Sequence, residues 1–401
     1  MNSPRRLAVV ASHPVQYYAP LFRELAARVD LTVFYCHRDT AQDQARAGFG
    51  QGFAWDVDLT SGYDHSFLEN QSRKPELGSF FGVDTPEIGT RLREGNFDAV
   101  LVMGWYFKCF LQALFAAKRA GIPVMVRGDS QLGTPRSALK MLAKEVLYPP
   151  FLRLFDAALF VGEHNRAYWH HYAYPDARMF ASPHCINTKW YSSRATSDAR
   201  DALRQKLGIS EQTPIALFAG KLIDFKRPWD VILAAEQVRK NGMPVEVLIA
   251  GSGPLEADLR ALAKQCDVPL HMLGFCNQSQ MPAAYAAADV LVLPSTARET
   301  WGLVANEAIA CGKPVIVSDA VGCAPDLAGD GRAGLTFRLG DAAECAKAMR
   351  EMLAHPPSSG VIEKISQNHS METAANGIIK ALEVVAKAGR SRPWGLRLSK
   401  G

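Results

Sequence analysis

Short, apolar, β-rich runs that alternate with helical patterns constrain the fold of this chain most strongly. Such continuous runs are typical of parallel strands covered by helices on both faces, and not of strands with one face in water. The first series lies at residues 7–12, 31–36, 98–103, 122–127 and 156–162. A second series follows at residues 214–220, 245–251, 269–275, 289–295 and 313–319. The two series predict an α/β protein with two doubly wound, Rossmann-like parallel-sheet domains.

The length of 401 residues agrees with two domains, because single cores stop growing at about 250–300 residues. The stretch at 192–208 is polar and reads as the linker. We therefore assign residues 1–195 to an N-terminal domain and 196–370 to a C-terminal one, and expect the helical segment 371–401 to return and complete the first domain. Ligands of such sheets bind at the carboxyl ends of the strands, so two facing domains predict one deep cleft.

Composition excludes several classes of function. Forty-five Lys and Arg against 40 Asp and Glu leave no large basic excess, so nucleic acid is not expected as a partner. Eight scattered cysteines without a Cys-x-x-Cys motif indicate neither a zinc knuckle nor a disulfide framework. The apolar run after the first arginines is too short for a signal peptide, and no apolar run approaches the roughly 20 residues of a membrane helix. We expect a cytoplasmic protein.

The most informative segment, residues 294–319, reads as a strand end, a loop, a helix and another strand. It carries Glu299 and Glu307, which would lie ~12 Å apart if the span were helical. That separation exceeds the roughly 5–9.5 Å that lets two carboxylates share one glycosidic bond. The pair could instead hold the two ends of a long ligand whose central diphosphate rests on the free amides of the helix N-terminus. A nucleotide sugar has this shape.

Two lysines and a glycine turn precede this segment. Lys221 ends an apolar run and Lys226 lies in the loop before the next helix, so the two cations could neutralise a leaving diphosphate. Each lysine alone would read as an ordinary surface residue. Gly251 and Gly253 mark a strand-to-helix turn, which fits a nucleotide loop or simply a tight βα turn.

Together these residues resemble the retaining, glycogen-synthase-like glycosyltransferases of family 4, also called group 1, which have the two-domain GT-B fold. The matching stretches cover most of the second domain: GKL and FK within 220–226, GSGPL at 251–255, LGF at 273–275, YAAADVLVLPS at 285–295 and the two glutamates separated by seven residues. The resemblance implies that Glu299 contacts the hydroxyls of the donor sugar and that Glu307 contacts those of the ribose.

The resemblance also implies roles for the neighbouring residues. The amides of Thr300, Trp301, Gly302 and Leu303 would hold the phosphates, with Lys221 and Lys226 on the diphosphate. Many relatives carry arginine where Lys221 stands, and lysine keeps that charge without the bidentate fork. Selectivity for the base would come from the backbone near Phe275, so the residue types there carry little information about the base.

The first domain resembles the family less closely. Its first strand-to-helix loop is similar to a subgroup of bacterial transferases that begins His-Pro-x-Gln-Tyr, which implies that His13, Gln16 and Tyr17 face the cleft. Many relatives place a histidine on the acceptor side after a later strand. Residues 127–131 stand at the comparable position here, so Arg127 or Asp129 would take that place.

Asp56-x-Asp58 matches the metal-binding Asp-x-Asp of the other large glycosyltransferase fold. The match has three residues and lies in a loop-rich stretch that we place outside the cleft. We expect no metal site and no cofactor beyond the sugar donor.

The sequence pattern of residues 135–155 predicts an amphipathic helix. Arg136, Lys140 and Lys144 share one face, while Leu139, Leu142, Ala143 and Val146 share another. The pattern fits a surface helix that packs its apolar side on the core. It also fits a peripheral contact with the inner face of the cytoplasmic membrane, where lipid-linked acceptors reside.

The sequence thus predicts a retaining transferase that moves a hexose-type sugar from a UDP- or GDP-sugar to a hydroxyl acceptor. The acceptor would be a glycan or a lipid-linked intermediate of bacterial polysaccharide or lipopolysaccharide synthesis. Two alternatives stay open, a nucleotide-sugar 2-epimerase of the same fold and a non-catalytic protein that binds sugar nucleotides. The glutamate pair favours the transferase over the epimerase, and the presence of Glu299 and both lysines argues against a degenerate site.

Overall fold

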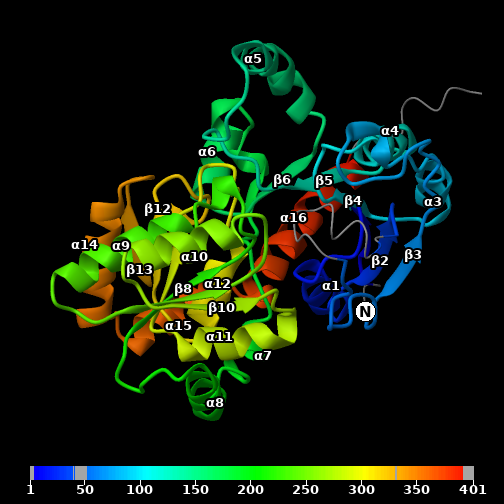
Figure 1. Cartoon of the computed structure of the whole chain (residues 1–401). Helices are drawn as coiled ribbons and strands as arrows, with labels where there is room; N and C mark the ends of the chain where they lie inside the picture. Colours follow the sequence, from blue (N-terminus) through cyan, green and yellow to red (C-terminus); the bar gives the residue numbers. More distant parts are fainter. Residues whose placement is uncertain (1–3, 39, 41–51, 330–331, 392–401) are drawn as a thin grey trace, which may run out of the picture.

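The structure, a computed structural model, describes residues 4–38, 40, 52–329 and 332–391. Two sheets, in which every strand pair is parallel, are each covered by helices (Figure 1). The prediction of two doubly wound α/β domains is therefore confirmed. No helix within these described ranges has the length and apolar character needed to cross a membrane.

The first sheet has seven strands in the order β3-β2-β1-β4-β5-β6-β7. The strands are β1 (Arg6–Ala11), β2 (Asp30–Tyr35), β3 (Asp64–Phe67), β4 (Ala99–Val102), β5 (Val124–Arg127), β6 (Ala157–Phe160) and β7 (Met179–Ala181). The helices of this part of the chain are α1 (Tyr18–Ala26), α3 (Ile88–Glu94), α4 (Lys108–Ala120), α5 (Ala138–Leu152) and α6 (Glu163–His171), with short 3₁₀ turns at η2 (Phe80–Gly82) and η3 (Asp176–Arg178).

The second sheet has six strands in the order β10-β9-β8-β11-β12-β13. The strands are β8 (Ile215–Ala219), β9 (Glu246–Ala250), β10 (Leu270–Gly274), β11 (Val290–Leu293), β12 (Val315–Ser318) and β13 (Gly334–Phe337). The helices are α9 (Trp229–Lys240), α10 (Glu256–Gln265), α11 (Met281–Ala287), α12 (Leu303–Ala310), α13 (Ala324–Leu327), α14 (Ala342–Ala354) and α15 (Ser359–Asn368), with 3₁₀ turns η4 (Asp224–Lys226) and η5 (Gln278–Gln280).

The chain crosses between the domains twice, and the two crossings lie together. After β7 it enters the second domain through α7 (Thr188–Ser192) and α8 (Ser197–Leu207), and an isolated bridge pairs Ile186 with Ser370 on the way back. The helix α8 joins the second domain, because buried Arg204 donates to the carbonyl of Ala287 at 2.9 Å and to Asp289 at 2.8 Å.

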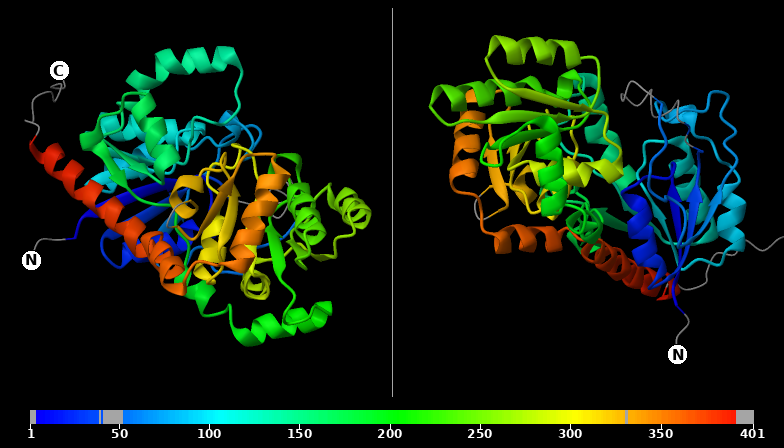
Figure 2. Two further views of the ribbon diagram at one scale, coloured as in Figure 1. Left: turned by 90° about the vertical axis from the view of Figure 1, so that its left-hand side faces the viewer. Right: turned by 60° about the horizontal axis from the view of Figure 1, so that its bottom comes forward.

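The last helix, α16 (Met371–Ser391), returns to the first domain and runs along its underside (Figure 2). Its buried side chains, among them Ala374, Ile378 and Leu382, join the core beneath β1 and α1. Gly377 allows this close approach, since a Cβ there would lie 1.8 Å from the carbonyl oxygen of Ala181. Residues 371–391 therefore belong with the first domain in the structure.

Candidate active site

A cavity of about 430 Å³ lies where loops after β8, β9, β10 and β11 face the first domain. Its position follows from the parallel topology, which puts the carboxyl ends of these strands at one edge. The second domain contributes Ala219, Gly220, Lys221, Ile223, Phe225, Lys226, Ala250, Gly251, Ser252, Phe275, Cys276, Gln278, Met281, Glu299, Val304 and Glu307, while Gln16, Tyr17, Trp55 and Tyr191 approach from the other side.

Two lysines and one glutamate gather at one end of the cavity. Lys226, in η4, forms an ion pair with the carboxylate of Glu299, and both side chains are largely buried. Burial, and after it the charge of Lys221, lower the pKa of Lys226 to about 7. Burial also lowers the pKa of Lys221. The two predicted cations therefore lie in one site, next to the first predicted glutamate.

Glu307 lies on α12 and is almost completely buried. Its two carboxylate oxygens accept hydrogen bonds from Tyr17 at 2.9 Å and from Tyr285 at 2.6 Å. Burial raises the pKa of Glu307, and the hydrogen bonds from the tyrosines oppose that shift. Because Tyr17 belongs to the first domain, this carboxylate links the two halves of the protein.

The loop before α12 is shaped by Gly302, which has a φ of +96°. A Cβ at Gly302 would lie 2.5 Å from the side chain of Leu293, so glycine suits the position in both conformation and space. Leu303 begins the helix, and the first amides of a helix have no partner inside it. These amides can donate hydrogen bonds to phosphate oxygens.

Trp301 does not line the cavity. Its buried indole nitrogen donates to Asn306 at 2.7 Å, and its ring lies 5.2 Å from that of His184. Thr300 also points to the first domain, where its hydroxyl donates to Asp129 at 2.7 Å. The side chains of these two residues hold the domain interface, which leaves only their backbone for the predicted phosphate contact.

The turn after β9 allows the loops after β8 and β9 to touch. A Cβ on Gly251 would lie 1.8 Å from the carbonyl oxygen of Gly220, which explains glycine at this position. Gly253 lies in the same turn but does not line the cavity, whereas Phe275, after β10, does.

The predicted first-domain residues separate into two groups. Gln16 and Tyr17 line the cavity, whereas His13, Arg127 and Asp129 do not. Arg127 is buried and donates to the carbonyl oxygens of Ser182 at 3.2 Å and Pro183 at 3.0 Å. It therefore supports the segment through which the chain leaves the first domain, and the structure does not bring it to the cavity.

Sequence reasoning missed three residues of this region. Trp55 and Tyr191 line the cavity, and Gln131 donates to the carbonyl oxygens of Ala297 at 2.8 Å and Glu299 at 3.2 Å. Gln131 thus holds the loop that carries Glu299. Gln131 ends the stretch 127–131 that the sequence singled out, although its own role was not predicted. For Trp55, the one signal was a tryptophan in a glycine-containing loop.

The structure also corrects the placement of Asp56. We expected Asp56 and Asp58 outside the cleft, but Asp56 accepts a hydrogen bond from the amide of Ser279 at 3.2 Å, across the interface and next to Trp55. Asp58 accepts from the amides of Thr60 and Ser61 instead. Asp56 therefore contacts the second domain, whereas the amides bound to Asp58 belong to its own loop.

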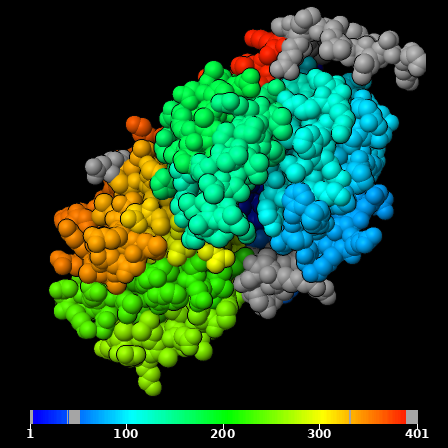
Figure 3. All heavy atoms as spheres, turned by 90° about the horizontal axis from the view of Figure 1, so that it is seen from above, coloured from blue at the N-terminus to red at the C-terminus, as the bar shows by residue number. Residues whose placement is uncertain are grey.

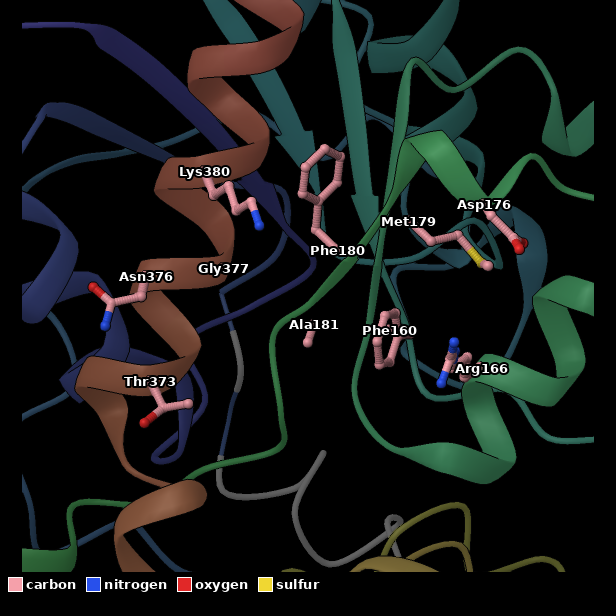
Figure 4. A pocket seen from close by; sticks show the side chains of 10 residues that line it. All are labelled: Phe160, Arg166, Asp176, Met179, Phe180, Ala181, Thr373, Asn376, Gly377 and Lys380. Carbon is pink, nitrogen blue, oxygen red and sulfur yellow. The ribbon is translucent and has the colours of Figure 1, made fainter.

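A second cavity, of about 540 Å³, lies on the outer edge of the first domain (Figure 4). Thr373, Gly377 and Lys380 of α16 line one side of it, and Arg166 of α6 lies on the other. Although it is larger, it contains none of the predicted site residues. The smaller cavity is the candidate active site because it combines buried ionisable groups with strand-end loops.

Comparisons with known proteins identify the fold. Residues 199–382 match the family model of the group 1 glycosyl transferases. A crystal structure of HepE from Anabaena in complex with UDP has a TM-score of 0.70 over 95% of this chain and 100% of that one, at 16% identity. Sucrose-phosphate synthase from Thermosynechococcus elongatus has a TM-score of 0.65 over 96% of this chain and 100% of that one, at 17% identity. The fold is therefore the GT-B fold of two facing Rossmann-like domains.

Curated relatives are similar to a further part of the chain. The chain is 28% identical over 280 residues to a GDP-mannose-dependent monoacylated alpha-(1-6)-phosphatidylinositol monomannoside mannosyltransferase of Corynebacterium glutamicum, covering 66% of this chain and 69% of that protein. It is 32% identical over 212 residues to a D-inositol 3-phosphate glycosyltransferase of Streptomyces avermitilis, covering 49% of this chain and 45% of that protein. Residues 199–382 are thus similar to the group 1 glycosyl transferases, and the chain is a glycosyltransferase. The predicted His-Pro-x-Gln-Tyr subgroup stays a prediction.

Proposed function

We propose that the protein is a retaining hexosyltransferase that binds the nucleoside diphosphate of its donor in the cavity of about 430 Å³. The observation that carries the proposal is that Lys221, Lys226, Glu299 and Glu307 all line this one cavity, with Lys226 paired to Glu299 and Glu307 bonded to Tyr17 of the first domain. Cations suit a diphosphate, and carboxylates suit the hydroxyls of a sugar and a ribose. UDP- and GDP-hexoses are the donors to compare first.

The ion pair between Lys226 and Glu299 supports an exchange of partners when the donor binds. The ammonium would turn from the carboxylate to the diphosphate, and the freed carboxylate would accept hydrogen bonds from the sugar hydroxyls. Both groups stay paired before and after binding, so neither is left as an isolated buried charge. This exchange is selective for a ligand that presents an anion and hydroxyls together.

In the proposed reaction the bond between the anomeric carbon and the diphosphate oxygen breaks as a bond to the acceptor oxygen forms. The proton of the acceptor hydroxyl passes to an oxygen of the leaving diphosphate on the same face, so the anomeric configuration is kept. Lys221, Lys226 and the first amides of α12 would stabilise the charge that grows on the diphosphate. No step requires a metal, and the acceptor would be a glycan or a lipid-linked intermediate.

Incubation of the protein with labelled UDP- and GDP-hexoses tests the proposal. Transfer to an acceptor alcohol, or slow donor hydrolysis, with retained configuration by NMR and in excess EDTA is the expected result. An inverted product, or activity that EDTA abolishes and Mn²⁺ restores, would contradict the mechanism. Interconversion of the sugar without its release would instead indicate an epimerase.

A further inference from the structure

The helix α5 carries an unusual distribution of side chains, which corrects the expectation that its apolar face packs on the core. Leu139 is 77% exposed, Val146 is 68% exposed, and Leu142 and Leu147 are also exposed. Lys144, on the opposite side of the helix, is buried. Figure 1 shows α5 projecting at the top of the first domain. The helix therefore turns leucines and a valine outward and a lysine inward.

Specific contacts hold the helix in this orientation. Lys144 donates to the hydroxyl of Tyr168 on α6 at 2.9 Å, and its ammonium lies 4.9 Å from the centre of the Tyr168 ring and 5.5 Å from that of Tyr172. Beside it, Glu145 pairs with His171 of α6 at 2.8 Å. Because the inward side is satisfied by polar and cation–π contacts, rolling the helix to bury its leucines would break them. The outward apolar face is thus a fixed feature of the surface.

Exposed apolar residues gather in the same part of the chain. Among the described residues, eleven large apolar side chains are classed as exposed, and nine of them lie within residues 104–154. Outside that segment they are Phe81, also in the first domain, and Val384. Figure 3, which looks down on this side, shows segments 104–120 and 138–152 both facing the viewer.

Positive charge is concentrated in the same segment. Residues 104–154 contain eight Lys and Arg but two Asp and Glu, whereas the rest of the chain contains 37 Lys and Arg and 38 Asp and Glu. The net positive charge of the protein therefore comes from this segment alone. Arg136 precedes α5 and Lys140 lies on it, and both are exposed.

We propose that the outer face of α5, formed by Leu139, Leu142, Val146 and Leu147 with Arg136 and Lys140 at its side, docks on an anionic phospholipid bilayer. An apolar helix face bordered by cations enters the boundary between headgroups and acyl chains, and the cations attract anionic headgroups. A second copy of the chain fits less well, because it would bring the same cations against each other. The proposal goes beyond sugar transfer, since a transferase with a dissolved acceptor needs no such surface.

Flotation of the full chain with phospholipid vesicles, without any donor, tests the proposal. The wild-type chain should float with vesicles that contain phosphatidylglycerol, less with pure phosphatidylcholine, and less as salt rises, since screening shortens the reach of charges. Leu142→Ser combined with Val146→Ser should lower the partition coefficient about tenfold or more. Lys140→Glu should weaken binding to the anionic vesicles only. Val384→Ser on α16 and Lys206→Glu on α8 are matched controls outside the surface and should float like the wild type.

Two results would overturn the proposal. Wild-type protein that stays with the lipid-free fraction under all conditions has no such surface. A wild-type dimer, measured by light scattering, that becomes monomeric in the Leu142→Ser, Val146→Ser variant would show that a second copy covers the face. UDP binding by the same variant separates this test from the proposed function, because the variant should bind the nucleotide like the wild type whichever way flotation turns out.

Discussion

The two domains share one architecture but place their functional residues differently. In the second domain the cavity is lined by the loops that directly follow β8, β9, β10 and β11, where parallel-sheet topology puts a ligand. The first domain contributes Gln16 and Tyr17 from the start of α1, together with Trp55 from a loop after β2. The second domain therefore forms most of the cavity, and the first supplies one wall.

This difference separates residues that a local motif can identify from residues that only the assembled fold brings together. In the second domain, each strand, the loop after it and the site residue on that loop lie within one short stretch of sequence. The wall from the first domain depends on how the two halves meet, as in the hydrogen bond between Tyr17 and Glu307. Substitutions in the second domain should therefore affect donor binding and catalysis more than substitutions in the first.

The largest expected effect belongs to the lysines. Lys221→Met or Lys226→Met should lower kcat roughly 10²–10³-fold, with a smaller effect on donor affinity, because the charge they stabilise grows in the transition state. Steady-state kinetics with the accepted donor measures both quantities. Lys264→Met on the exposed side of α10 is the control. Near-normal turnover in both variants would remove the lysines from the site.

The two glutamates should differ in nucleotide affinity. Glu307→Ala should weaken binding of the bare nucleoside diphosphate by about 1.5–3 kcal/mol, or roughly 10- to 150-fold, the range for hydrogen bonds to charged groups. Glu299→Ala should spare it, because the sugar is absent. Calorimetry measures both, and thermal unfolding must accompany it because Glu307→Ala leaves two tyrosine hydroxyls without their acceptor. Equal losses would show that the roles are assigned wrongly.

The lowered pKa of Lys226 predicts a pH dependence of binding. In the free protein the ammonium is lost as pH rises through about 7, and a bound diphosphate raises that pKa because it favours the charged form. Affinity should thus be highest below pH 7 and fall by up to about tenfold per pH unit above it. Measurements above pH 7.5 avoid the phosphate ionisation near pH 6.

Lys226→Met is the comparison for this pH profile, since it removes the titrating group. The variant should bind the nucleoside diphosphate with an affinity that changes little above pH 7.5. A slope equal to that of the wild type would assign the titration to another group.

The smallest effect should come from Tyr17→Phe. Loss of its hydrogen bond to Glu307 should weaken nucleotide binding by about 0.5–1.5 kcal/mol, because the carboxylate loses one of the groups that orient it. Tyr106→Phe, at an exposed tyrosine of the same domain, is the matched control. Unchanged affinity in Tyr17→Phe would mean that the hydroxyl of Tyr17 does not assist nucleotide binding.

The fold could be predicted from the sequence except at three of the four sheet edges. All ten apolar runs became strands, while β3, β7 and β13 were missed, and each of these lies at the edge of its sheet. Edge strands have one strand neighbour and need no continuous apolar run, as the sequence DHSF of β3 illustrates. The continuous apolar run that identifies central strands is therefore absent from β3, β7 and β13.

The site could be predicted where one motif holds both the strand end and the side chain, as for Glu299, Glu307 and the two lysines. It could not be predicted where contacts cross between domains, as for Gln131 and Trp55. Arg127 illustrates the opposite error, because its place after a strand suggested a site residue while its guanidinium binds carbonyl oxygens of the backbone. Sequence pattern gives the strand end but not the direction in which a long side chain turns.

A crystal structure of the protein with bound UDP or GDP tests the central claim most directly. The nucleotide should occupy the cavity of about 430 Å³, with its ribose hydroxyls on Glu307 and its second phosphate beside Lys221 and Lys226. A nucleotide with its ribose on Glu299, or one bound in the cavity between α6 and α16, would contradict the account.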